Sequence, residues 1–394
     1  MGKKISISLT VSLIALTAAL TCVLTMSYAR RQFNEKISEV DRLSQKYQRL
    51  EELDAKVQDE YYTEISADDV TDGMLAGYVR GLGDPYSAYR SAKELSEYED
   101  SNAGVYTGVG ISVTKNDEGY AEIVSVIEEG SADQAGLIAG DLIVEVEGVS
   151  VKESYREAID QFFGEQGTTV QVKVKKADSG KIVTYKLLRA QIDEITVESK
   201  LLRNRIGYIR IMKFRSVTVS QFETARQELL KKGAQALIFD VRDNGGGVLS
   251  ALEQLIDPML PEGELAFATD RSGNQTTIIE SDAGFEEMPY CVLVNGNTAS
   301  ASELFACLLR DYSDAILIGE KTFGKGIMQT TFALSSGGVT LTTATYETGV
   351  TPCYHGVGLE PDVLVEADPD SEDDVQLDAA VDAIIARIKE NNAA

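Results

Sequence analysis

The stretch ALIFDVRDNGGG, residues 236–247, decides the fold class of this chain of 394 residues. Its first half, 236–241, is an almost continuous apolar run, which is typical of a strand buried on both faces of a sheet. Three glycines at 245–247 follow and give flexible backbone at the predicted start of a helix. This order is typical of α/β proteins, which place their active-site loops at the carboxyl ends of parallel strands.

The same alternation extends to both sides of this stretch. Residues 206–211 have the pattern of a strand and residues 219–232 that of a helix, so a βαβ unit leads into the glycines. Helices are expected after Gly247 and Ala299, and we predict an α/β core over residues 191–370. Further buried strands are predicted at 265–268, 291–294 and 315–318.

A second pattern, over residues 104–190, predicts a separate α+β domain that resembles a PDZ domain. The run Gly108-Val109-Gly110-Ile111 opens a strand, and its glycines would let backbone N–H groups converge on a terminal carboxylate while the strand edge pairs with the peptide. Turns often contain such a glycine pair. Its combination with AGLIAGDLI at 135–143 favours the PDZ interpretation, with the amphipathic segment 155–163 flanking the groove.

Charge and composition exclude several classes of function. The 63 acidic and 37 basic residues give a net charge of −26, which repels nucleic acid and leaves no basic stripe to bind it. A single histidine, His355, is too few for a multi-histidine zinc site, and the four cysteines have no CxxC or CxxxC spacing. We therefore expect no nucleic-acid partner, no metal and no other cofactor.

The first 30 residues predict a membrane segment. Two lysines precede the uncharged stretch 5–29, which at about 1.5 Å per residue is long enough to cross a hydrocarbon core of roughly 30 Å. A signal-anchor is favoured over a signal peptide cleaved after Ser27-Tyr28-Ala29, because the stretch exceeds a normal h-region. Two arginines follow the segment, so charge alone leaves its orientation open.

Helical patterns flank the folded domains. Residues 31–103 carry apolar residues at helical spacing, and residues 371–394 predict a C-terminal helix. The first region either packs on its own domain or forms a dimerisation arm, and fewer than four heptads leave the two alternatives nearly even. We expect a homodimer through these terminal helices.

Ser300 and Glu303 follow the predicted strand at 291–294. Ser300 would stand at a helix N-terminus, where its hydroxyl is exposed and the N–H of Ala301 can join an oxyanion hole. An N-cap serine is, however, the commoner use of serine there. Glu303 lies on the same helix face and either hydrogen-bonds within the site or completes a capping box.

A serine nucleophile needs a base, and the sequence offers few. His355 lies in a loop punctuated by Pro and Gly, without an obvious acidic orienter. Lys325, between two glycines, is the stronger candidate, although most lysines are surface residues. Its pKa would have to fall from about 10.4 toward 7, a shift of roughly 4 to 5 kcal/mol that burial can supply. Gln329 could orient the amine without adding a charge.

Together these motifs resemble the C-terminal processing peptidases, the tail-specific proteases of serine peptidase family S41. The resemblance includes GLGDPYS at 81–87, the PDZ-like domain and, in this order, the segments 240–247, 295–303 and 324–329 that carry the candidate site residues. It implies a crotonase-like α/β core with an inserted PDZ domain that gates access and binds apolar, uncharged protein C-termini. Bacterial members work outside the cytoplasmic membrane. The resemblance thus implies a single-pass membrane protein with an extracytoplasmic body, or a secreted one if the N-terminal segment is cleaved.

The resemblance also implies roles for the reactive residues. Ser300 would be the nucleophile that forms an acyl-enzyme, Lys325 its base and Gln329 the partner that orients the lysine. Two other functions are weighed against this endopeptidase. A catalytically inactive PDZ scaffold would have no reason to keep the three residues together, and a crotonase-type acyl-CoA enzyme has no use for a PDZ domain or a membrane segment.

The implied oxyanion hole consists of backbone N–H groups. One belongs to Ala301 and the other to a glycine of the run 245–247, with Gly246 as the expected residue. The segment Asp243-Asn244-Gly245 departs from the commoner family pattern, which has a Pro or Ser before the glycine pair, so the choice among the three glycines stays open.

Overall fold

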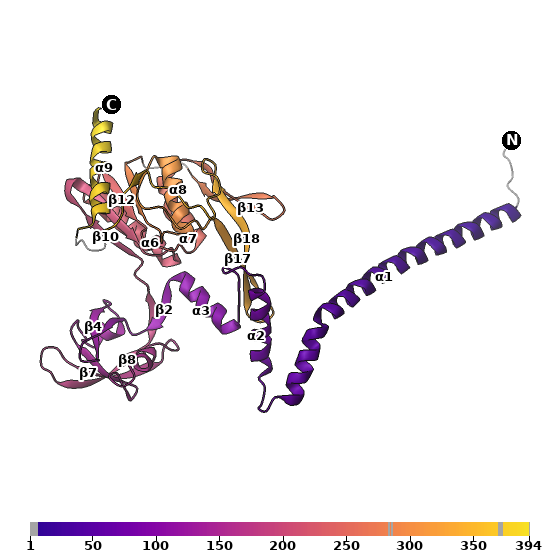
Figure 1. Ribbon diagram of the computed structural model, residues 1–394, viewed down its shortest axis with the longest axis horizontal. Helices are drawn as coiled ribbons and strands as arrows, with labels where there is room; N and C mark the ends of the chain where they lie inside the picture. Colours follow the sequence, from indigo (N-terminus) through magenta and orange to yellow (C-terminus); the bar gives the residue numbers. More distant parts are fainter. Residues whose placement is uncertain (1–6, 283, 285–286, 369–372, 394) are drawn as a thin grey trace. The chain divides into compact units, whose positions relative to one another are not determined.

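The computed structural model describes residues 7–282, 284, 287–368 and 373–393 (Figure 1). Its chain divides into two compact units, 1–74 and 75–394. In the first unit α1 (Ile7–Glu60) is one continuous helix of 54 residues. The sequence has no Gly or Pro between residues 3 and 72, so nothing interrupts the helix at the predicted boundary after residue 30. Within the described residues, only Leu9–Phe33 is long and apolar enough to cross a membrane, and none of it is buried.

The region predicted as helical up to residue 103 also contains a strand. Helix α2 (Ala67–Arg80) is followed by β1 (Ala88–Arg90), which pairs antiparallel with β18 (Gly338–Thr348). Helix α3 (Ala92–Ala103) begins at a capping box of Ser91 and Glu94 and ends at Gly104 in the left-handed conformation. The predicted helical region thus contains α2 and α3 with a strand between them, and the Asp-Pro turn at 84–85 precedes that strand.

The predicted PDZ-like region forms a six-stranded sheet of order β3-β4-β5-β7-β8, with β6 paired to β5. Strands β2 and β9 pair separately, and β3 has no partner beyond β4 among the described residues. A core of buried side chains, including Ile123, Ile143 and Val172, underlies the sheet. The strands and helices are β2 (Val105–Gly108), β3 (Ile111–Lys115), β4 (Ala121–Val126), α4 (Ser131–Gln134), β5 (Leu142–Val146), β6 (Val149–Ser150), α5 (Tyr155–Asp160), β7 (Thr169–Lys175), β8 (Ile182–Leu188) and β9 (Ala190–Asp193).

The remaining chain forms an α/β core around a sheet of order β10-β11-β12-β15-β16-β19, parallel except for β10. The predicted strands at 206–211, 236–241, 291–294 and 315–318 are confirmed within it as β11, β12, β15 and β16. Its strands are β10 (Val197–Leu201), β11 (Ile206–Ile211), β12 (Ala236–Asp240), β15 (Tyr290–Val294), β16 (Ile316–Gly319) and β19 (Val363–Leu364). A second sheet has the order β1-β18-β13-β14, with β17 paired to β18. The latter contains β13 (Gly263–Asp270), β14 (Gln275–Ser281) and β17 (Ile327–Ala333).

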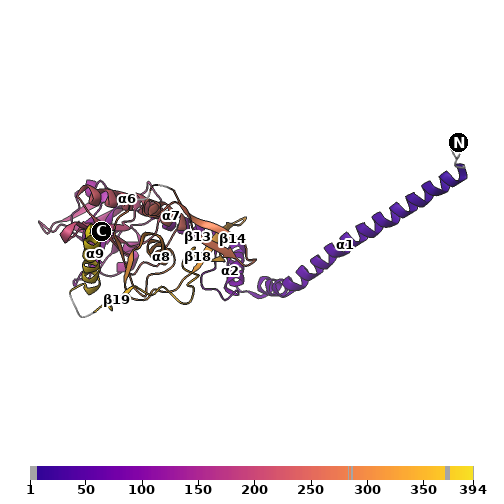
Figure 2. The same ribbon diagram turned by 90° about the horizontal axis from the view of Figure 1, so that it is seen from above.

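Successive side chains of a strand point to opposite faces of the sheet, so the buried strands of the parallel sheet present apolar side chains on both faces. Helices cover both of these faces. Leu237 and Phe239 pack with the group α6, α7 and α8, whereas Ala236 and Ile238 pack with α9. Figure 2 shows α9 apart from α6, α7 and α8. The helices are α6 (Ser216–Lys231), α7 (Leu249–Ile256), α8 (Ala301–Ser313) and α9 (Val375–Ala393), with short 3₁₀ turns at Arg203–Arg205 and Asp257–Met259. Because β12 and β15 are parallel neighbours, the loops that follow them lie at the same end of the sheet.

Candidate active site

Ser300 lies between β15 and α8 in a strained backbone conformation. Its φ of 59° and ψ of −123° are unusual for a residue with a side chain. Such strain persists only where the surrounding structure imposes it, and it is concentrated at functional sites. Here Ala299 N–H donates to the Asn244 carbonyl at 3.0 Å, and the Thr298 hydroxyl donates to the Val241 carbonyl at 2.9 Å. The turn before α8 is thus fixed against the loop after β12.

The carboxylate of Glu303 connects this turn to the lysine loop. Glu303 is completely buried. One oxygen accepts the N–H groups of Ser300 at 2.9 Å and Lys325 at 2.8 Å. The other accepts the Gly324 N–H at 2.7 Å and the Thr322 hydroxyl at 2.5 Å. Glu303 therefore makes the backbone contact of a capping box and also hydrogen-bonds within the site. From the sequence we expected only one of these two roles.

The side chain of Lys325 is half-buried, and its Nζ lies 4.5 Å from the centre of the Tyr86 ring. Burial lowers the pKa of Lys325, and it outweighs the opposing charges of Asp84 and Glu303. This is the direction that a general base requires. Among the described residues, no hydrogen bond joins the Lys325 amine to Ser300.

Gln329 lies on β17, four residues after Lys325, and its side-chain amide donates to the Thr342 hydroxyl at 3.2 Å. Gln329 and Ser300 line the same cavity, which has a volume of about 260 Å³. Apolar side chains form much of its wall, among them Val248, Leu304, Ile327 and Met328. The nucleophile candidate therefore faces a small pocket suited to an uncharged side chain.

Two glycines after β12 have close neighbours, and the first, Gly246, packs directly against the serine turn. A Cβ added to Gly246 would lie 2.8 Å from Ser300 Cβ and 2.9 Å from Ala301 N. The Gly246 N–H already donates to Asn244 Oδ1 at 2.9 Å. Gly247 pairs with Phe214 through the Gly246 carbonyl and the Val248 N–H, so its own N–H points away from Phe214, and Gly247 lines the cavity.

Comparison with known proteins identifies the family. Sequence models for peptidase family S41 and for the PDZ domain match residues 205–365 and 122–176. The carboxy-terminal-processing protease of Bartonella bacilliformis is 31% identical over 326 residues, which cover 81% of this chain and 74% of that protein. Carboxy-terminal processing protease CtpA of Bacillus subtilis is 32% identical over 324 residues, covering 82% and 69%. This chain belongs to the carboxy-terminal processing proteases of peptidase family S41.

The family resemblance inferred from the sequence motifs is thereby confirmed, and the S41 protease is a serine peptidase with a PDZ domain. Among solved structures, it is similar to the photosystem II D1 C-terminal processing protease, with a TM-score of 0.48 and 28% identity. That similarity covers 84% of this chain and 90% of the other.

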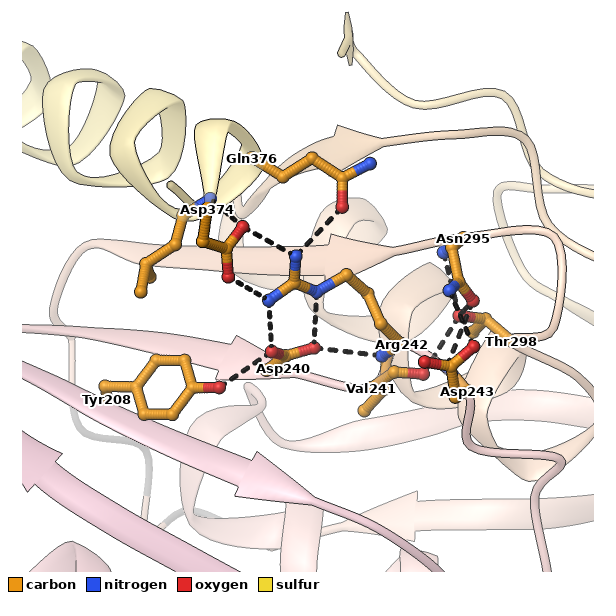
Figure 3. A network of polar contacts seen from close by, with 10 residues as sticks. Tyr208, Asp240, Val241, Arg242, Asp243, Asn295, Thr298, Asp374 and Gln376 are labelled. Atoms are coloured by element: carbon orange, nitrogen blue, oxygen red, sulfur yellow. Dashed lines mark hydrogen bonds and ion pairs between the residues drawn. The ribbon is translucent and has the colours of Figure 1, made fainter. Parts of the chain in front are cut away.

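The S41 protease also contains a polar network that the sequence motifs did not reveal (Figure 3). Asp243, with a φ of 60°, accepts the side-chain amides of Asn295 and Asn297, each at 2.9 Å. Its own N–H donates to Asn295 Oδ1 at 3.0 Å. These hydrogen bonds outweigh burial and lower the pKa of Asp243. The loop after β12 is thus attached to the loop that precedes Ser300.

The neighbouring Arg242 attaches the same loop to the start of α9. Its guanidinium donates to both oxygens of Asp240, at 2.6 and 3.0 Å, and to both oxygens of Asp374, at 2.7 and 2.9 Å (Figure 3). Gln376 accepts a further hydrogen bond from it at 2.9 Å. Two paired carboxylates around one guanidinium hold its plane fixed. The sequence carries no local signal for this contact, because Arg242 and Asp374 lie 132 positions apart.

His355, the alternative base, is exposed. Within the described residues its imidazole has no hydrogen bond or ion pair that would orient it. The backbone of His355 lies close to Gly326, since a Cβ added to Gly326 would be 2.8 Å from the His355 backbone N. The geometry thus favours Lys325 over His355 as the candidate base.

Proposed function

We propose that this S41 protease is a serine endopeptidase in which Ser300 is the nucleophile and Lys325 the general base. The observation that supports this most directly is the position of Glu303, whose single buried carboxylate binds the backbone N–H groups of both residues. The strain at Ser300 and the lowered pKa of Lys325 agree with it.

In the proposed reaction the neutral Lys325 amine takes the proton of Ser300 Oγ as that oxygen attacks the scissile carbonyl. The C–N bond then breaks, the lysine ammonium returns the proton to the leaving amine, and the acyl group stays on Ser300. Water, deprotonated by the same amine, then attacks the ester; the acyl C–Oγ bond breaks, and the ammonium returns the proton to Ser300 Oγ. Gln329 orients the amine, which has to approach Ser300 from its position over Tyr86.

The N–H groups of Ala301 and Gly247 stabilise the negative charge on the carbonyl oxygen. Ala301 is the first residue of α8, so its N–H has no partner within the helix. We assign the second donor to Gly247 in place of Gly246, because the Gly246 N–H is bound to Asn244 whereas Gly247 lines the cavity.

Cleavage of casein by the full chain in detergent, together with labelling by a fluorophosphonate, tests this function. Fluorophosphonates react covalently with an activated serine hydroxyl. We expect casein fragments and one labelled peptide, the one that contains Ser300. Labelling at another serine would contradict the assignment. Absence of both cleavage and label would favour the alternative, a catalytically inactive PDZ scaffold.

We propose that the PDZ domain binds the apolar C-termini of substrates along β3. The Val109 and Gly110 carbonyls accept hydrogen bonds from Ala132 and Ile127, at 3.1 and 2.9 Å, inside the domain. The N–H groups of Val109 and Gly110 have no acceptor among the described residues. Gly108 and Ile111 complete this loop, next to the open edge of β3. Such N–H groups suit a terminal carboxylate.

Fluorescence anisotropy on the Ser300→Ala chain would measure this binding. A labelled peptide that ends in apolar residues with a free carboxylate is expected to bind at least about tenfold more tightly than the same peptide with a C-terminal amide, because the amide lacks the charge. Equal affinities would refute capture of the carboxylate.

We further propose a bacterial membrane protein with its catalytic body outside the cytoplasmic membrane, anchored by Leu9–Phe33. By the same proposal the core is crotonase-like, and the terminal helices α1 and α9 form a homodimer. Degradation of the body by a protease added to intact cells would support the orientation, and protection of the body would refute it. A monomer in light scattering at micromolar concentration would refute the dimer.

A further inference from the structure

The Lys325 ammonium is held by an aromatic ring from the motif GLGDPYS at 81–87. Its Nζ lies 4.5 Å from the centre of the ring of Tyr86. We propose that Tyr86 is a positioning residue, whose ring holds the charged form of Lys325 away from Ser300 until the amine gives up its proton. This inference rests on the proposed role of Lys325 as the general base.

The ring of Tyr86 has a fixed position relative to the catalytic core. Asp84 accepts the Tyr86 N–H at 3.0 Å and the Ser87 hydroxyl at 2.6 Å, which forms a closed turn. The Ser87 hydroxyl in turn accepts the N–H of Thr342 on β18 at 3.1 Å. The residues that follow form β1, which pairs with β18 from Ala88 onward. Tyr86 is therefore attached to the sheet that also carries the hydrogen-bond partner of Gln329.

An aromatic face attracts a cation but has little attraction for a neutral amine. The charged and titratable groups around Lys325 are Asp84 on the turn of Tyr86, Glu303 on α8 and Tyr346 on β18, whose hydroxyl donates to the Lys325 carbonyl at 2.6 Å. Neither carboxylate forms an ion pair with the Lys325 amine in the described structure. The ring is thus the direct partner of the ammonium.

Burial and the ring act on Lys325 in opposite directions. Burial disfavours the ammonium and lowers the pKa of Lys325. The ring favours the ammonium, so its removal should lower this pKa further. Because the neutral amine is the base, a lower pKa increases the reactive fraction at any pH on the acid side of the activity profile.

The pH profile of kcat/KM distinguishes this role from a merely structural one. In Tyr86→Leu, which keeps an apolar side chain but no ring, the acid limb should move down by about half to one pH unit. At a fixed pH on that limb kcat/KM should rise about three- to tenfold. Tyr86→Phe keeps the ring face and should retain the acid limb of the wild type. An unmoved acid limb in Tyr86→Leu, or one displaced to higher pH, would overturn the proposal.

A second measurement does not depend on activity. Competitive acetylation with acetic anhydride across a pH range, read by mass spectrometry, gives the apparent pKa of the Lys325 amine in the Ser300→Ala chain. Lys321, whose Nζ lies 2.7 Å from Glu360, is a lysine of the same loop and serves as the internal reference. Addition of Tyr86→Leu should lower the pKa of Lys325 and leave the labelling of Lys321 unchanged.

The two measurements separate the two hypotheses. If Tyr86→Leu lowers the Lys325 pKa in the labelling experiment but the chain with Ser300 intact does not cleave casein, the contact with Tyr86 is supported and the proposed function is refuted. If the Lys325 pKa is unchanged or raised but the chain with Ser300 intact cleaves casein through Ser300, the role of Tyr86 is overturned and the proposed function stands.

Discussion

Ser300→Ala and Lys325→Ala are each expected to lower kcat/KM for casein by at least about 10³-fold, because a nucleophile and its base act as one unit. Without Oγ no acyl-enzyme forms, and without the amine nothing takes the proton from Oγ at neutral pH. His355→Ala should stay within about twofold of the wild type, since substitutions of exposed residues outside a site have small effects. The three variants should be assayed at equal concentration after their thermal unfolding midpoints have been compared.

The pattern across the three variants identifies the base. An inactive His355→Ala beside an active Lys325→Ala would show that the imidazole, and not the amine, activates the serine. Loss of activity together with a much lower unfolding midpoint would mean that the substitution acts through stability. Because Glu303 binds the backbone N–H groups of Ser300 and Lys325, which both alanine variants keep, we expect folded variants.

The core strands could be predicted well from the sequence because buried strands have a distinctive local composition. The runs at 206–211, 236–241 and 291–294 are almost entirely apolar, and a strand buried on both faces needs little else. Boundaries in the N-terminal region were harder. Both the apolar and the charged parts of α1 favour helix, so no local signal marks residue 30, and β1 depends on pairing with β18, about 250 residues away.

The site residues also divide into those with a local sequence signal and those whose contacts depend on distant segments. Ser300 and Lys325 stand out by their neighbours, and helical spacing places Glu303 on the face of Ser300. The other contacts of Glu303, with Gly324 and Thr322, join distant segments and have no sequence signal. The contact between Tyr86 and Lys325 is of the same kind, since it brings together residues that are far apart in the sequence.

Gly247→Ala is expected to destabilise the protein by about 3 kcal/mol or more and to reduce kcat at least about 10²-fold. A Cβ at this position would lie 1.9 Å from the Phe214 carbonyl oxygen, and φ is 151°, a value that L residues rarely adopt. The backbone would have to move away from Phe214, and the proposed oxyanion donor would move with it. Urea denaturation and the kcat of the variant at saturating substrate measure the two effects.

Gly245→Ala is the matched control, two residues earlier in the same loop. Gly245 is exposed, and a Cβ there would meet no atom within 4 Å. Its stability should remain within about 0.5 kcal/mol of the wild type. A Gly247→Ala variant as stable and as active as Gly245→Ala would show that the pairing of Gly247 with Phe214 is absent in solution. In that case the second oxyanion donor would have to come from elsewhere, and the hydrogen bond between Gly246 and Asn244 would be the next contact to test.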